Sequence, residues 1–292
     1  DAAQGHGLTV SGDTEHSIAV GNPFTGDDRA IYFDGTDDYL DMPDSTDFTL
    51  GSGDFTYECW LNPSSLPTSG SVSVFGQGNS LGQTASGSVG LGYQASVGGI
   101  GFSWYDSTNS ISYDPTYSGT TGSTRASGTT SVSTNTWYHF AIVRSGATVT
   151  MYKDGVSYSS VTLESSSANI NDSSHKYSIG RWGEYDGSYF NGYIYDVRFT
   201  KGTAVYTGAF TPPTSKLTAD ATYTKLLVQP DKDDTDFHDE SASGHTITTY
   251  SAPTRTASTP YDAAAKSTAM YFDGSGDYIT TSWDSASDFD FG

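Results

Sequence analysis

The sequence predicts an all-β protein in which many short strands and tight turns form an antiparallel sandwich or barrel. Gly, Ser, Thr, Asp and Tyr are abundant whereas Lys, Glu and Leu are scarce, which favours strands and turns over helices. No window keeps a helical apolar spacing beyond about two turns. Short apolar segments alternate with turn signals along the chain, at a density typical of β-sandwiches and barrels.

An internal repeat organises the chain. Ala30–Leu40 recurs as Ala269–Ile279, an offset of 239 residues, and seven of the eleven residues are identical. The matches that extend the repeat are Gly5-His6 with Gly244-His245, Leu8-Thr9 with Ile247-Thr248 and, after two inserted residues, Asp47–Gly51 with Asp288–Gly292. The sequence therefore holds one full period and the opening of a second, and we expect it to be a window from a longer protein.

The repeat and the changes in composition divide the chain into four predicted segments. Residues 1–29 are N-terminal strands or a linker that joins the first module, and residues 30–230 form that module. Residues 231–268 are an acidic linker followed by polar strands, and residues 269–292 are the opening strands of a second module. The strands predicted within the first module cover residues 31–33, 39–42, 53–63, 72–75, 91–93, 100–104, 136–144, 148–153, 156–158, 177–181, 190–200 and 226–230.

Two Asp-Gly pairs predict hairpin turns within the first module. Asp34-Gly35 predicts a hairpin between the first two strands of the module, and Asp154-Gly155 predicts a second hairpin. The strands of residues 269–292 are too few to bury an apolar face, so we expect their edges to be unpaired. Either the chain continues into a second module, or these strands are donated to a neighbouring subunit by strand addition.

Charge and composition exclude several classes of protein. The net charge is −21, and Lys and Arg do not cluster, so we expect no nucleic-acid partner. The acidity fits solubility and mutual repulsion, and it also fits calcium binding or life in salty water. Cys59 is the one cysteine, which excludes a disulfide framework and is expected in the core. The sequence contains no membrane span, so we expect no membrane insertion.

An ordered set of motifs over residues 30–230 resembles the laminin-G-like, concanavalin A-like jelly roll, the class shared with pentraxins and legume lectins. The motifs are Phe33-Asp34-Gly35, Asp38-Tyr39, Asp54–Trp60, Trp137–Ala141 with Arg144, Tyr152–Gly155, Ile179-Gly180 and Gly192–Arg198. The tail Lys201–Tyr206 with Phe210–Pro213 is similar to versions in structural proteins of marine bacteriophages and in large bacterial surface proteins. The resemblance implies two antiparallel sheets with a concave face, often one calcium ion at the rim, and binding of glycans or proteins.

Acidic residues cluster beside the first Asp-Gly turn. Asp34, Asp37 and Asp38 lie within five residues, and carboxylates on a loop are ligands that calcium prefers. The alternative is a simple turn in which the Asp side chains cap backbone N–H groups. Asp34 and Asp38 recur in the second copy as Asp273 and Asp277, whereas Asp37 is replaced by Gly276. Asp34 and Asp38 are the candidate metal ligands, with calcium as the candidate cofactor of this turn. The simple-turn interpretation stays open, because the elements shared by both copies are also those that a hairpin requires.

Aromatic residues make up 14% of the chain, and those outside the core strands are candidates for stacking on sugar rings. The candidate ligand-binding residues, which include two carboxylates on the Gly-rich loop after Arg181, are Trp104, Tyr105, Trp182, Glu184, Tyr185, Asp186 and Tyr189. A glycan surface at these residues requires that the rings are not packed against the protein.

A glycan hydrolase is the enzymatic alternative, because glucanases share this fold class. Retaining glycosidases need two carboxylates about 5 Å apart, and the laminarinase-type motif is Glu-x-Asp-x-x-Glu. Glu184-Tyr185-Asp186 begins such a motif, but Tyr189 stands where the second Glu is required. The six His residues are scattered without zinc-binding spacing, and His139 lies in an expected core strand.

These observations predict a non-enzymatic structural or adhesion protein of tandem modules, extracellular and part of a virion tail fibre, a decoration protein or a cell-surface filament. Its expected partners are other copies of itself or neighbouring subunits of the virion or filament, and cell-surface glycans. The alternative is a calcium-dependent carbohydrate-binding lectin module of a larger surface protein, and a glycan hydrolase is the third hypothesis.

Overall fold

The computed structural model describes residues 8–11, 29–78, 89–106, 111–113, 129–163, 165–170, 174–183, 187–230, 237–250, 253–256 and 278–281. The chain divides into two compact units. Asp27–Tyr261 form a β-sandwich, and the terminal segments Asp1–Gly26 and Asp262–Gly292 form the second unit.

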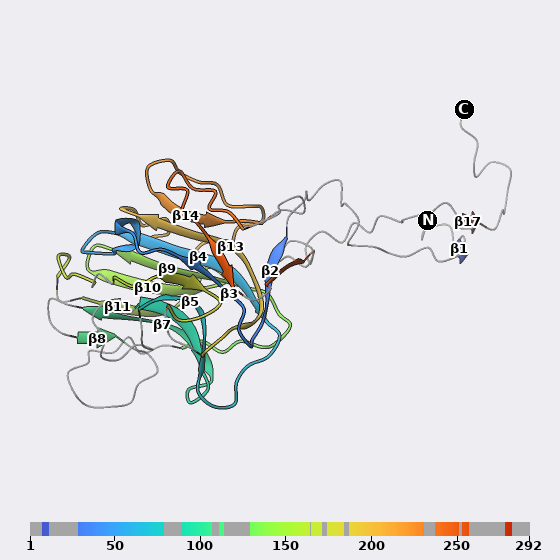
Figure 1. Ribbon diagram of the computed structural model, residues 1–292, viewed down its shortest axis with the longest axis horizontal. Coiled ribbons are helices and arrows are strands. Elements are labelled where there is room, and N and C mark those ends of the chain that lie inside the picture. Colours follow the sequence, from blue (N-terminus) through green and yellow to red (C-terminus); the bar gives the residue numbers. More distant parts are fainter. Residues whose placement is uncertain are drawn as a thin grey trace. The chain divides into compact units, whose positions relative to one another are not determined.

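Two antiparallel sheets form the sandwich (Figure 1). The first sheet has the order β11 (Val156–Thr162), β10 (Thr148–Lys153), β9 (Tyr138–Ser145), β4 (Phe55–Pro63), β13 (Asn191–Lys201), β2 (Ala30–Asp34) and β16 (Thr254–Thr256), and β14 (Thr224–Val228) also pairs with β13. The second sheet has the order β15 (Thr248–Tyr250), β3 (Tyr39–Met42), β12 (Tyr177–Ile179), β5 (Ser71–Gln77), β6 (Val89–Gln94), β7 (Gly99–Asp106) and β8 (Ile111–Tyr113). The predicted fold class, an all-β jelly-roll sandwich of concanavalin A type, is confirmed.

Aromatic rings fill the space between the two sheets. Tyr57 of β4 stacks on Phe199 of β13 with ring centroids 4.2 Å apart, and it also stacks on Phe75 of the opposite sheet at 5.0 Å. Tyr177 of β12 stacks on Phe48, which belongs to the 3₁₀ turn Thr46–Phe48, at 4.9 Å. Cys59 is fully buried in the same core, as its apolar strand predicts.

The first Asp-Gly turn does not make the predicted hairpin. β2 pairs with β13 and β16 in one sheet, whereas β3 pairs with β12 and β15 in the other. The expectation of β2–β3 pairing is therefore wrong, because the connection crosses from sheet to sheet. Asp38 accepts the Asp34 N–H and Asn191 donates to the Asp34 carbonyl, so neither backbone group of Asp34 serves β2–β3 pairing.

The second Asp-Gly pair behaves as predicted. β10 and β11 form an antiparallel hairpin around Asp154 and Gly155, both of which have positive φ. The Asp154 carboxylate accepts the backbone N–H of His139 at 2.9 Å, which ties the turn to β9.

Strands from the segment expected as a linker complete both sheets. β15 adds to the free side of β3, and β16 adds to β2. The sequence predicts polar strands in residues 231–268, but it does not show that their partners belong to the first module.

The unit formed by the terminal segments contains one described strand pair. β1 (Leu8–Ser11) pairs antiparallel with β17 (Tyr278–Thr281). The expectation of an unpaired edge is therefore wrong for residues 278–281, because their partner lies in the same chain.

The part of the chain that the structure describes contains no helix long and apolar enough to cross a membrane.

Candidate functional site

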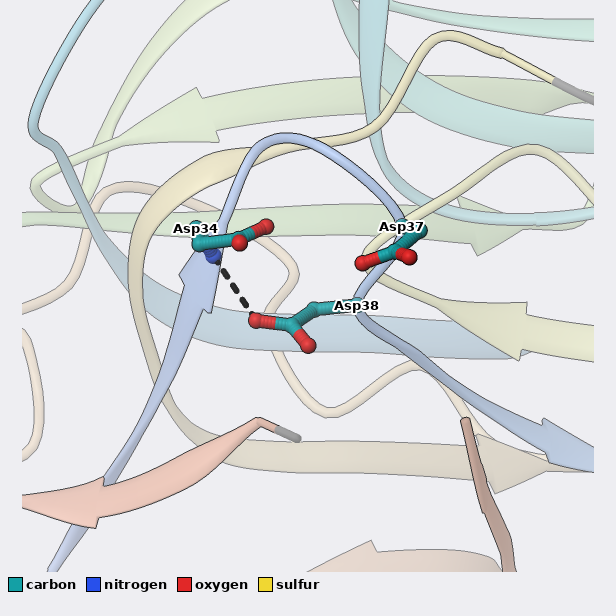
Figure 2. A group of neighbouring side chains, drawn as sticks. All are labelled: Asp34, Asp37 and Asp38. Atoms are coloured by element: carbon teal, nitrogen blue, oxygen red, sulfur yellow. Dashed lines mark hydrogen bonds between the residues drawn. The ribbon is translucent and has the colours of Figure 1, made fainter. Parts of the chain in front are cut away.

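The connection between β2 and β3 gathers three carboxylates at one turn (Figure 2). Asp34 Oδ1 accepts the N–H of Thr36 at 2.7 Å, and Asp38 Oδ2 accepts the N–H of Asp34 at 3.0 Å. Gly35 has φ of +80°, and a Cβ there would lie 2.6 Å from the Cβ of Asn191. Glycine is therefore required at position 35 both by the backbone conformation and by the close approach of Asn191.

These carboxylates fit part of a calcium site. One oxygen from each of Asp34, Asp37 and Asp38 lies within 4.8 Å of the other two. Calcium–oxygen distances of about 2.4 Å allow two ligands of one ion to be up to roughly 4.8 Å apart, so the three oxygens are close enough to share an ion. Calcium takes about six to eight oxygen ligands, so these three oxygens would supply at most half of them. Two of the carboxylates also cap backbone N–H groups, as the simple-turn interpretation requires.

A pair of stacked tyrosine rings lies next to this turn. Tyr39 directly follows Asp38, and its ring stacks on the ring of Tyr189 with centroids 6.0 Å apart. Both tyrosines are half-buried. We call Asp34, Asp37, Asp38, Tyr39 and Tyr189 the turn site.

Arg181 fixes the position of the Tyr39 ring. Its guanidinium carbon lies 3.5 Å from the ring centroid, and its Nη2 atom lies 3.1 Å from Oδ2 of Asp41. Asp41 also accepts a 2.6 Å hydrogen bond from Ser178, and it lies 3.3 Å from the Lys176 amino group. Arg181 and Asp41 are both buried and form an ion pair, and Lys176 is a second, partly exposed cation beside Asp41.

Two of the predicted ligand-binding rings are packed against the protein. Trp104 is fully buried beside Phe102, and Trp182 is 2% exposed. Gly76 and Gly90 are opposite each other in the β5–β6 pair, and a Cβ at Gly90 would collide with the Trp182 side chain at 2.6 Å, whereas one at Gly76 would lie in tight contact with it at 3.2 Å. The prediction of sugar stacking is therefore wrong for Trp104 and Trp182, because neither ring has a face open to a ligand.

The other predicted ligand residues divide between described and undescribed positions. Tyr189 lies in the turn site. Tyr105 belongs to β7, but its side chain lies outside the described part, as do Glu184, Tyr185 and Asp186. These three follow Gly183 and precede Gly187 in the sequence, on the loop that links Arg181 to Tyr189.

A buried cluster with the groups of an acid–base site lies elsewhere. Glu58 Oε1 accepts from Nε of Arg198 at 2.9 Å, its Oε2 accepts from the Tyr206 hydroxyl at 2.7 Å, and His139 Nε2 is 3.3 Å from Oε2. Burial alone would raise the pKa of Glu58, but His139, Arg198 and Tyr206 together hold this pKa below its ordinary value. Glu58 is 1% exposed and His139 is fully buried, so this cluster is structural, as expected for His139.

A cavity of about 530 Å³ lies beside β15. Its lining includes His238, Asp239 and His245. The Asp239 carboxylate already accepts backbone N–H groups from Leu227, Ser241 and His245, so it serves the local fold.

Sequence reasoning did not find Tyr39 or Arg181 as site residues. Tyr39 belongs to a predicted strand, and Arg181 stands 142 positions further along the chain. Their contact depends on the pairing of β3 with β12, for which the sequence carries no local signal.

The sandwich with a turn site at a crossing between its sheets is a lectin-like architecture, and the family comparison agrees. Residues 34–205, more than half of the chain, match the laminin-G-like model of the concanavalin A-like lectin/glucanases superfamily. The chain belongs to this superfamily. No curated protein gives a significant match.

Several solved structures are similar to the chain at low identity. A "putative carbohydrate binding protein" from Bacteroides ovatus is 17% identical over 78% of this chain and 61% of its own, with a TM-score of 0.48. Domains LG4-5 of the mouse laminin alpha1 chain are 14% identical over 63% of this chain and 47% of theirs, with a TM-score of 0.40. A heptameric SAP-like pentraxin from Limulus polyphemus is 14% identical over 76% of this chain and 94% of its own, with a TM-score of 0.40. The chain thus spans less than two thirds of the first two structures.

Proposed function

We propose that this chain is a non-enzymatic adhesion module that binds carbohydrate at the turn site. The observation that carries the proposal is the half-exposed Tyr39–Tyr189 stack directly beside the exposed carboxylates of Asp34 and Asp37. Membership of a lectin and glucanase superfamily supports a glycan as the ligand.

The two kinds of group at the turn site match the two kinds of surface on a sugar. Arg181 covers part of the Tyr39 ring and Tyr189 stacks on it, so the apolar surface offered to the C–H face of a pyranose is the exposed part of the two tyrosines. Ionised carboxylates are acceptors, and sugar hydroxyl groups are donors. The buried Arg181–Asp41 pair holds the Tyr39 ring before a ligand arrives, which lowers the entropic cost of binding.

Calcium is part of the proposal. Asp34, Asp37 and Asp38 would hold the ion, and the bound ion would offer a positive charge to sugar hydroxyl groups. Asp34 and Asp38 recur at the equivalent positions of the second copy, which supports a role for them in both modules.

The setting we propose is extracellular, in a virion tail fibre, a decoration protein or a cell-surface filament built from tandem modules. The internal repeat supports tandem modules, and the net charge of −21 would keep such a surface protein soluble.

A glycan array with the labelled protein, read in calcium and again in EDTA, tests the proposal. Binding to at least one glycan is expected, with loss in the variants Tyr39→Ala and Tyr189→Ala. Tyr223→Ala is the matched control, because Tyr223 is 41% exposed and does not belong to the turn site. The proposal is wrong if no glycan binds, or if both turn-site variants bind as the unchanged protein does.

A separate assay for glycan hydrolysis tests the proposal that the chain is not an enzyme. The best glycan from the array is incubated with the protein, and new reducing ends are quantified over time. Unchanged glycan is expected, whereas steady release of reducing ends would establish a hydrolase.

A further inference from the structure

β15 completes the first sandwich although its sequence opens the second period. The offset of 239 residues relates Thr248–Tyr250 to residues 9–11, which lie in β1. The same offset relates Tyr39–Met42, the strand β3, to residues 278–281, the strand β17. The pairs β15–β3 and β1–β17 are therefore built from equivalent sequence.

The two pairs also have the same register. In the sandwich the partners are Thr248 with Asp41, Thr249 with Leu40 and Tyr250 with Tyr39. In the terminal unit they are Thr9 with Thr280, Val10 with Ile279 and Ser11 with Tyr278. Each of the first three pairs becomes one of the second three under the offset of 239, and both ladders are antiparallel. A slip of one residue would invert the faces of a strand, so equal registers indicate the same junction formed twice.

Contacts around β15 reinforce this equivalence. His245 lies against the Phe48 ring at 4.6 Å, and its Nε2 atom is 3.3 Å from Asp47 Oδ2. The repeat contains the equivalents of these residues: His6 corresponds to His245, and Asp288-Phe289 corresponds to Asp47-Phe48. Both copies of the repeat therefore contain the strand and the residues that contact it.

The position of β15 in the sequence shows which period donates the strand and which module receives it. β15 comes from the start of one period and completes the sheet of the module before it. By equivalence, β1 is a strand for a preceding module, and β17 is an edge that receives a strand from a following period. β1 and β17 are therefore complementary strands with the same register as β15 and β3.

We propose that β1 of one copy of this chain pairs with β17 of a second copy, which links the copies head to tail through backbone hydrogen bonds. A sheet of two four-residue strands is marginally stable alone, so the pair within one chain can open. Exchange of an identical element between copies keeps every hydrogen bond of the closed pair. Each contact uses different surfaces on the two copies, so the link can propagate. This link does not depend on glycan binding.

Disulfide trapping between separately produced variants tests the link. Val10 and Ile279 face each other, and antiparallel partners have Cα atoms about 4.5–5.5 Å apart, within disulfide range. Val10→Cys and Ile279→Cys proteins carrying tags of different mass are mixed in about 0.5 M NaCl, because each copy is strongly acidic and salt screens the repulsion. The mixture is oxidised and separated without reductant. Buried Cys59 remains in place, and the unchanged protein controls for it.

A mixed disulfide that joins the two tags is the expected result. Leu8→Cys mixed with Tyr278→Cys is the control for register, because these positions are at opposite ends of the ladder and no cross-link is expected. The double variant Val10→Cys/Ile279→Cys reports pairing within one chain. A disulfide in the double variant without any mixed disulfide overturns the proposal, and so does the absence of both.

Discussion

The guanidinium group of Arg181 lies over the ring of Tyr39, with its central carbon 3.5 Å from the ring centroid. The same side chain pairs with Asp41, two positions beyond Tyr39 on β3. A planar cation over an aromatic face is a favourable contact, and a buried ion pair fixes the cation in place. The half-exposed tyrosine is therefore held in place by a buried ion pair.

Arg181→Lys removes the planar stack but retains a positive charge for Asp41. We expect glycan binding at the turn site to weaken by about tenfold, or ~1.4 kcal/mol, because an ammonium does not cover the Tyr39 ring as a guanidinium does. Calorimetric titration with a glycan from the array measures the change. Lys176→Met is the control, because Lys176 also contacts Asp41 but its side chain is 42% exposed. Unchanged affinity in Arg181→Lys would show that the stack does not position Tyr39 for binding.

Calcium should stabilise the sandwich if the turn site holds the ion. At a calcium concentration of about 100 Kd, a folded-state ligand stabilises by about 2.7 kcal/mol, which thermal unfolding detects as a higher Tm. Asp34→Asn and Asp38→Asn should abolish this rise, and Asp37→Asn should reduce it less, because the second copy has Gly276 at that position. Asp220→Asn is the matched control, since Asp220 is also an exposed turn-capping carboxylate. No rise in Tm with millimolar calcium would contradict calcium binding at the turn site and would support the simple-turn interpretation.

The sequence predicts the sandwich because strand-forming segments and turn signals are local, but partner choice is not local. Asp34-Gly35 is a turn, as predicted, yet its two strands enter different sheets, because Asp38 and Asn191 occupy the backbone groups of Asp34. A two-residue turn signal cannot reveal a partner such as Asn191, which stands 157 positions away.

Non-local strand pairing also explains why the sequence does not distinguish buried aromatic rings from exposed ones. Trp182 follows a predicted strand and precedes a Gly-rich segment, and this position predicts an exposed ring that could stack on a sugar. Its ring occupies the space over Gly76 and Gly90, and only the β5–β6 pairing brings these glycines together. Tyr189 resembles Trp182 in its sequence setting, but it stacks on Tyr39 and stays half-buried.

Trp182→Ala should therefore change stability rather than recognition. Removal of a buried Trp typically lowers the free energy of unfolding by about 3–5 kcal/mol, since a cavity replaces its packing. Tyr189→Ala, at a half-exposed ring on the same loop, should lower it by much less. Urea denaturation of the two variants measures both values. Similar losses in the two variants would contradict the assignment of Trp182 to the core and Tyr189 to the surface.

Glu58 gives a test of how the buried charges support the sandwich. Its pKa is lower in the folded chain than its ordinary value of 4.5. A carboxyl group of this kind stabilises the fold above its unfolded pKa, and the contribution is lost as pH falls through the folded pKa. Glu58→Gln should lower the free energy of unfolding at pH 7 by about 3–5 kcal/mol, because it leaves the largely buried Arg198 charge unpaired.

The Glu58→Gln variant should also lose less stability than the unchanged protein between pH 5 and pH 3, both values being about half a unit or more from the ordinary pKa. Urea denaturation across this range gives both profiles, with Glu240→Gln as the control at an exposed carboxylate. If the Glu58→Gln profile ran parallel to that of the unchanged protein, Glu58 would not be the group whose protonation weakens the fold.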